Sequence, residues 1–114
     1  MDEIPKKWTA CHRFARIAPR KVRVLLDILR GRRCDDAMAQ LQFNPRRGAK
    51  MLQVVLKSAM ANADEAEADM HRLFVRAAFV DGGPYYRRWR PKDRGRAHPI
   101  AKRTSHITLE LGVR

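Results

Sequence analysis

The chain has 114 residues, of which 25 are lysine or arginine and 12 are aspartate or glutamate, so its formal net charge is +13. An apolar fraction of 45% excludes a disordered chain, and the length allows one hydrophobic core, so we expect a single RNA-binding domain over residues 1–114. The cations run from Lys6 to Arg114, which favours a nucleic acid over a membrane surface as partner. No run approaches the roughly 20 apolar residues of a membrane span, and residues 1–7 lack a signal peptide's apolar stretch. We therefore expect no membrane insertion and a cytoplasmic location.

The first elements are a strand and a helix. Residues 8–17 mix β-forming with basic residues and predict a strand. Pro19 then opens a helix that Gly31 ends. Its apolar residues recur at three- and four-residue spacing: Val22, Leu25, Leu26 and Leu29. Its opposite face is basic and is expected to contact phosphates, through Arg20, Lys21, Arg23 and Arg30.

Two further helices follow. Asp35 or Asp36 is predicted to cap a short helix that ends near Gln42. Asn44-Pro45 starts the longest helix, which runs to about Ala63. The apolar stripe of this helix is typical of packing on a sheet and consists of Met51 or Leu52, Val55, Leu56, Ala59 and Met60.

Two β-patterned runs frame a basic arm. Residues 73–80 and 105–113 alternate apolar with other residues. The predicted inward positions are Leu73, Val75, Ala77, Phe79, Ile107, Leu109 and Leu111. Between the runs, residues 81–105 are basic, poor in aliphatic residues and broken by glycine and proline, which indicates a protruding hairpin. The predicted fold is α+β, with three helices packed on a small three-stranded antiparallel sheet and one long protruding β-hairpin.

The arm interleaves cations with aromatic residues. This combination suits phosphate contacts and stacking on bases, and we expect the partner to order the arm. A solvated basic loop is the alternative, but such a loop has no use for exposed aromatic residues. The predicted RNA-binding residues of body and arm are Arg13, Arg16, Arg20, Lys21, Arg23, Tyr85, Tyr86, Arg87, Arg88, Trp89, Arg90, Lys92, Arg94, Arg96, Lys102, Arg103 and His106.

No catalytic or metal-binding pattern stands out. Cys11 and Cys34 form no CxxC motif, and the four histidines form no HxxxH pair. The acidic segment at residues 62–69 lacks the loop glycine and spacing of a calcium hand, so we expect a solvent-facing linker there. We expect no enzymatic activity, no cofactor and no metal, and cysteines that are buried thiols rather than a disulfide.

Four sequence blocks resemble a known family. They are RFARIAPRKVRVLLDILRGR at residues 13–32, LKSAMANAD at 56–64, FVDGGP at 79–84 and GRAHPIAKRTSHITLEL at 95–111. In this order they resemble the bacterial form of large ribosomal subunit protein 22, over nearly the whole chain from about residue 12 to 113. The resemblance implies a three-helix, three-stranded body at the subunit surface and a hairpin that threads through ribosomal RNA to line the nascent-peptide exit tunnel. By position, the tunnel-lining tip comprises Arg90, Pro91, Lys92, Asp93, Arg94, Gly95 and Arg96, of which Lys92 and Asp93 depart from the family pattern.

The expected function is therefore that of a ribosome-bound structural protein of the large subunit, which binds ribosomal RNA and supports subunit assembly. The resemblance implies three partners: large-subunit ribosomal RNA, neighbouring ribosomal proteins and the nascent polypeptide. The alternative is an architectural DNA-binding protein that uses a basic β-arm. Such arms usually come from an obligate dimer, whereas this chain is expected to offer no apolar face beyond its own core, so we expect no homo-oligomer.

Overall fold

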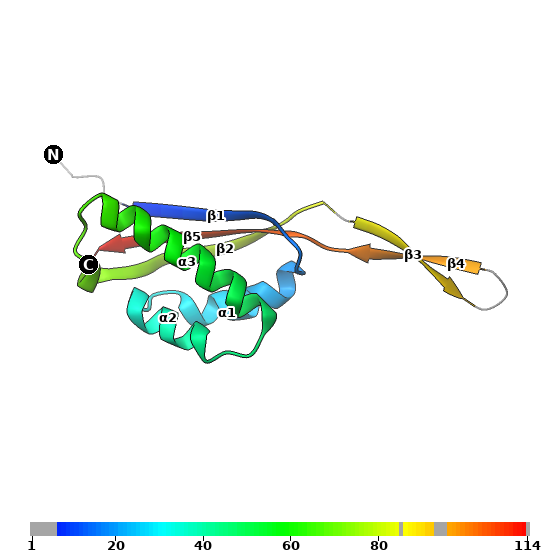
Figure 1. Ribbon diagram of the computed structural model, residues 1–114, viewed down its shortest axis with the longest axis horizontal. Helices are drawn as coiled ribbons and strands as arrows, with labels where there is room; N and C mark the ends of the chain where they lie inside the picture. Colours follow the sequence, from blue (N-terminus) through cyan, green and yellow to red (C-terminus); the bar gives the residue numbers. More distant parts are fainter. Residues whose placement is uncertain (1–6, 85, 93–95, 114) are drawn as a thin grey trace.

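In the computed structural model, the chain forms a body of helices and strands from which a two-stranded arm extends (Figure 1). The structure describes residues 7–84, 86–92 and 96–113, with the backbone alone for 86–92 and 96–102. The elements in chain order are β1 (Lys7–Ala15), α1 (Pro19–Leu29), α2 (Cys34–Gln42), α3 (Arg47–Glu65), a 3₁₀ turn η1 (Met70–Arg72), β2 (Leu73–Gly82), β3 (Tyr86–Lys92), β4 (Arg96–Lys102) and β5 (Ser105–Val113).

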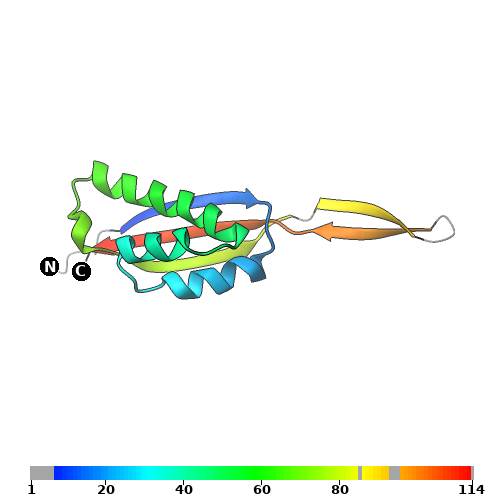
Figure 2. The ribbon, with the colours of Figure 1, turned by 60° about the horizontal axis from the view of Figure 1, so that its bottom comes forward.

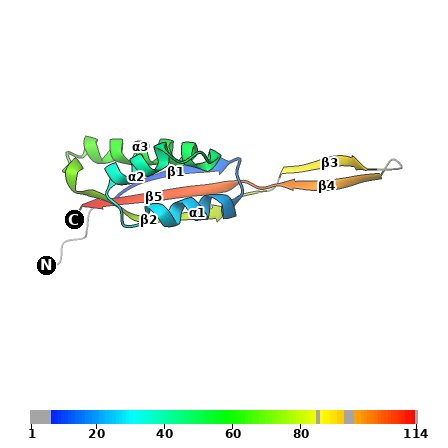
Figure 3. The ribbon, with the colours of Figure 1, turned by 90° about the horizontal axis from the view of Figure 1, so that it is seen from below.

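The body is built on an antiparallel sheet in the order β1-β5-β2, so the last strand lies between the first and the second. Helix α1 packs on β2, helix α3 packs on β1 and β5, and α2 packs mainly on α3. The three helices thus cover one face of the sheet, as Figures 2 and 3 show. This arrangement confirms the predicted α+β fold, including the first strand as a member of the sheet.

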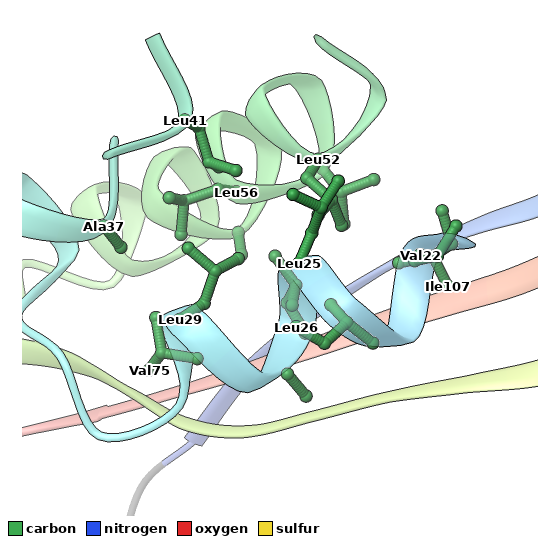
Figure 4. Close-up of a cluster of buried hydrophobic side chains, with 14 of the residues drawn as sticks. Val22, Leu25, Leu26, Leu29, Ala37, Leu41, Leu52, Leu56, Val75 and Ile107 are labelled. Atoms are coloured by element: carbon green, nitrogen blue, oxygen red, sulfur yellow. The ribbon is translucent and has the colours of Figure 1, made fainter. Parts of the chain in front are cut away.

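The core lies between the helices and the sheet (Figure 4). Pro19 stands in the first turn of α1, and the predicted stripe of that helix is fully buried: Val22, Leu25, Leu26 and Leu29. The inward residues of α3 and β5 meet this stripe, namely Leu52, Val55, Leu56, Ala59, Ile107, Leu109 and Leu111. Gly31 adopts a φ of +79°, and its N–H donates to the carbonyl oxygen of Val75 at 2.9 Å. This turn fixes the end of α1 against β2.

Strand β2 departs from the predicted alternation after Val75. The pairing register with β5 shifts between Val75 and Ala77. As a result Ala78 and Val80 are buried, whereas Ala77 is half-buried and Phe79 is exposed, so the prediction for these last two residues is wrong. A β-bulge adds one residue to a strand and thereby reverses which side chains face the core.

The start of α2 and the state of the cysteines correct two further predictions. Helix α2 begins at Cys34, and Arg33 before it gives no side-chain cap, so neither Asp35 nor Asp36 is the cap. Both carboxylates lie in the first turn, where their negative charge interacts favourably with the positive end of the helix dipole.

Both thiols are free as predicted, but only Cys34 is buried, because Cys11 lies on the exposed face of β1. Within the described residues, no three histidine, cysteine or acidic side chains gather as a metal site would need.

The end of α3 corrects one more expectation. Asp64 and Glu65, predicted to lie in a linker, belong to the end of α3, although both are exposed to solvent as expected. Two apolar side chains of the body, Phe43 and Val54, are 88% and 68% exposed. Over the described residues, no helix combines the length and the apolar character needed to cross a bilayer.

Burial of Cys34 predicts a pH dependence of stability. Burial raises the pKa of its thiol to about 11, and the neighbouring Asp35 carboxylate adds to the rise. Between about pH 9 and 11 the folded chain keeps a proton that the unfolded chain has lost, so the stability present below this window should fall by roughly 2 to 3 kcal/mol across it. Urea unfolding at both ends of the window measures the change. The Cys34→Ala variant should lose this pH-dependent fall in stability. If its free energy of unfolding still falls with pH as in the wild type, the fall does not come from the Cys34 thiol.

Candidate nucleic-acid interface

A basic groove lies where the first turns of α1 and α3 meet the segment after β1. Its volume is about 720 Å³. Six exposed cations line it: Arg16, Arg20, Lys21, Arg46, Arg47 and Arg103. Its floor is apolar and includes Ile17, Val24 and Leu25. We refer to this feature as the basic groove.

Hydrogen bonds hold the wall of the basic groove in place. The Nη2 atom of Arg47 donates to the carbonyl oxygen of Arg16 at 2.6 Å, which ties the start of α3 to the segment before α1. The buried Ser105 hydroxyl donates to the carbonyl oxygen of Ile17 at 2.5 Å. The segment between β1 and α1 is therefore fixed from two sides, by α3 and by β5.

The N-termini of two helices open onto the basic groove. Helix α1 begins at Pro19 and α3 begins at Arg47, and the residues before them, Ala18 and Arg46, give no side-chain cap. The Oδ1 atom of Asn44 instead accepts a hydrogen bond from the Arg46 N–H at 3.0 Å and shapes the turn into α3. The positive end of a helix dipole favours a bound anion, as does any first-turn N–H group that has no partner within the helix.

Three cations of the basic groove are available to an external anion. Arg20, Lys21 and Arg46 form no side-chain hydrogen bond or ion pair with the part of the chain that the structure describes. Six cations around one groove repel each other unless a polyanion neutralises them. The arrangement is therefore suited to bind the phosphate backbone of a nucleic acid.

The basic groove brings together some of the predicted RNA-binding residues. It includes Arg16, Arg20, Lys21 and Arg103. Arg13 and Arg23 are exposed but do not line it. Arg30, also expected to contact phosphates, donates to the carbonyl oxygen of Ala78 at 2.9 Å and 2.7 Å and pairs with Asp27, and its phosphate contact stays a prediction.

Sequence reasoning missed Arg46 and Arg47. Both directly follow the Asn44-Pro45 start signal, which already placed them at the beginning of a helix. Their proximity to α1 depends on Gly48, where an added Cβ atom would lie only 3.0 Å from Cδ1 of Leu25. The glycine allows the two helices to approach closely, and its position early in a helix is the local sequence signal that indicates such an approach.

The arm continues the strand pair β2 and β5 as a second sheet (Figure 1). Strands β3 and β4 pair antiparallel from Tyr86↔Lys102 to Lys92↔Arg96. Gly82 pairs with Ser105 in the body, so the register shifts by one residue where the arm begins. The molecule measures 68 × 33 × 21 Å, and its length reflects the predicted protruding hairpin.

Most predicted contacts of the arm concern side chains that the structure leaves out. Tyr85, Asp93, Arg94 and Gly95 lie outside the described residues. For the others the backbone is described and places them on β3 or β4: Tyr86, Arg87, Arg88, Trp89, Arg90, Pro91, Lys92, Arg96 and Lys102. Their RNA contacts stay predictions.

His106 occupies the root of the arm. Its Nδ1 atom accepts a hydrogen bond from the Phe14 N–H at 3.1 Å, and the two rings meet edge to face with centroids 4.8 Å apart. Nearby, the Thr104 hydroxyl donates to the carbonyl oxygen of Pro84 at 2.7 Å, and the Gly83 N–H donates to that of Thr104 at 2.9 Å. One ring nitrogen of His106 is therefore already hydrogen-bonded within the protein.

Known proteins similar to this chain belong to one family. The profile of the family described as Ribosomal protein L22p/L17e matches residues 10–112. The large ribosomal subunit protein uL22 of Sorangium cellulosum (strain So ce56) is 48% identical over 103 residues, which are 89% of this chain and 92% of the relative. That of Geobacter metallireducens is 48% identical over 99 residues, 86% of this chain and 90% of the relative. That of Caldicellulosiruptor saccharolyticus is 44% identical over 110 residues, 96% of this chain and 90% of the relative.

Proposed function

This chain belongs to the ribosomal protein L22p/L17e family, and we propose that it is anchored in the large ribosomal subunit by ribosomal RNA bound in the basic groove. As a member of this family it is a structural ribosomal protein that serves translation in the cytoplasm, and it is not an enzyme. Its partners are ribosomal RNA and other ribosomal proteins. The body would then support subunit assembly by holding RNA segments together.

The basic groove carries the RNA-binding proposal. It joins six cations from the segment after β1, from the first turn of α1, from the start of α3 and the residue before it, and from the connection between β4 and β5. Phosphate contacts of this kind fix the position of a protein on a nucleic acid without reading its sequence. Arg13, Arg23 and His106 extend the proposed surface beyond the groove, toward the rest of β1, α1 and the arm root.

The arm carries the proposal for the exit tunnel. Strands β3 and β4 pair only with each other among the described residues, so the arm can enter a narrow RNA passage without disturbing the body. We place its tip, residues 90–96, along the nascent polypeptide, as sequence resemblance implies. The aromatic and basic residues predicted to bind RNA would then line its path.

The salt dependence of binding tests the RNA proposal. If the six cations of the basic groove each neutralise a phosphate, a plot of log affinity against log salt should have a slope of about −4 to −5. Fluorescence anisotropy with deproteinised large-subunit ribosomal RNA, from about 50 to 200 mM salt, measures this slope. A nearly salt-independent affinity would refute phosphate binding in the groove.

Duplex DNA of matched length is the control for the alternative partner. A ribosomal protein should retain binding to its RNA when such DNA is present in excess. Equal competition by the DNA would support the architectural DNA-binding alternative instead.

A further inference from the structure

The floor of the basic groove is apolar, which phosphate binding alone does not require. Ile17, Val24 and Leu25 line it beneath the cations. Val24 is 47% exposed although it stands in α1 among charged neighbours. The volume of about 720 Å³ lies within the roughly 300–1,000 Å³ of typical small-ligand sites. A hollow of this kind can hold a planar apolar group as well as surround anions.

We propose that the basic groove holds one unpaired nucleotide of the bound RNA, with its base against the apolar floor and its flanking phosphates on the surrounding cations. This inference rests on the RNA-binding function proposed above and adds the kind of RNA that the groove selects. The preferred site is a bulge or a loop, whereas a continuous duplex can use the cations alone.

The geometry of RNA supports an unpaired nucleotide. In an A-form helix the bases are stacked, and the deep major groove keeps their edges from side chains, so a duplex would leave the floor uncovered. Unstacked bases of loops and bulges can instead turn outward, pack against aromatic or apolar side chains and stack on guanidinium planes. An extruded base therefore uses both the floor and the arginines around it.

The basic groove is already shaped for such a base. The hydrogen bond from Arg47 to the Arg16 carbonyl oxygen holds one guanidinium group at the edge of the groove. The bond from Ser105 fixes Ile17, and Gly48 lets α3 approach within contact of Leu25. A site that is formed before binding loses little entropy when the ligand enters.

The test compares two short RNA hairpins that differ only in one bulged nucleotide. The full-length protein should bind the bulged hairpin about tenfold more tightly, because the extruded base is removed from water on the apolar floor. With 2-aminopurine as the bulged nucleotide, binding should also change its fluorescence, because the base leaves the stack.

Filling the basic groove tests whether this preference arises there. The Val24→Trp variant keeps the charge of the chain but fills the floor, so its affinity for the bulged hairpin should fall toward that for the paired one. Ile28→Trp is the matched control, since Ile28 is also exposed on α1 but does not line the groove. That control should keep the full preference, and circular dichroism verifies the fold of both variants.

The outcomes separate this inference from the RNA-binding proposal. Equal, salt-dependent affinities for both hairpins would overturn the bound nucleotide and leave phosphate binding intact. If the Val24→Trp variant still prefers the bulged hairpin, the unpaired nucleotide is not bound in the basic groove. If neither hairpin binds, and ribosomal RNA itself does not bind, the RNA-binding function on which the inference rests is overturned.

Discussion

Replacing Arg20, Lys21 and Arg46 with glutamate is expected to lower the affinity for large-subunit ribosomal RNA by at least about 100-fold. These cations line the basic groove, and their side chains form no hydrogen bond or ion pair with the part of the chain that the structure describes. Each replacement removes a phosphate contact and puts a negative charge in its place. The salt slope should also become shallower by about three, one for each lost contact. Anisotropy titrations at several salt concentrations measure both quantities.

A matched variant controls for total charge. Replacing Lys57, Arg72 and Arg76 with glutamate also lowers the net charge from +13 by two per residue, to +7, but these exposed residues lie outside the basic groove. This control variant should lose far less affinity for ribosomal RNA than the groove variant. Equal losses would show that the overall charge, and not the groove, binds the RNA. Thermal unfolding should show both variants folded, because neither set belongs to the core.

Removing the arm is expected to leave the body folded while abolishing the response of the ribosome to nascent chains that stall in the tunnel. The variant replaces residues 85–102 with an Asn-Gly turn and retains the Gly83 to Thr104 hydrogen bond at the root. Its free energy of unfolding should change by less than about 1 kcal/mol, since the deletion removes a strand pair that forms a separate sheet and shortens the connection between β2 and β5. Thermal unfolding and a stalling assay on variant ribosomes measure the two effects.

The separation of core and arm is the reason for this expectation. Among the residues whose burial the structure describes, the buried apolar side chains lie at positions 15–80 and 107–111, and the backbone of the arm pairs in its own sheet. Loss of the fold on deletion would show that the arm supports the core. An intact stalling response would show that the tip does not lie along the nascent chain.

The helices and the central strand could be predicted because their signals are local. Pro19, the three- and four-residue spacing up to Leu29, and the alternation from Ile107 to Leu111 each depend on residues close in sequence. Their burial followed as expected. Where one face of a helix or strand packs on a single core, the spacing of apolar residues is sufficient to predict which side chains are buried.

The bulge in β2 could not be predicted from the local pattern, and contacts with a segment distant in sequence lie directly beside it. Val75 donates its N–H to the carbonyl oxygen of Arg32 and accepts from the N–H of Gly31, both in the turn after α1. These contacts lie on the side of β2 away from β5. The alternation of Ala77 and Phe79 in the sequence carries no trace of them, so the predicted faces were wrong from that point on.

The basic groove was predicted only in part for the same reason. Arg16, Arg20 and Lys21 stand out beside a helix start, but Arg103 comes from the other end of the chain and Arg46 from another helix. Their convergence depends on how α1, α3 and β5 pack. The arm, by contrast, could be predicted from composition alone, because a segment that is too polar to form a core must protrude or bind a partner.

The most direct measurement is the occupancy of two variants in purified large subunits, determined by quantitative mass spectrometry against the wild type. If the basic groove anchors the protein, the variant without residues 85–102 should be present in most subunits, while the Arg20→Glu, Lys21→Glu, Arg46→Glu variant should be nearly absent. The reverse pattern, an absent arm deletion and a present groove variant, would place the anchor in the arm and contradict the role assigned to the body.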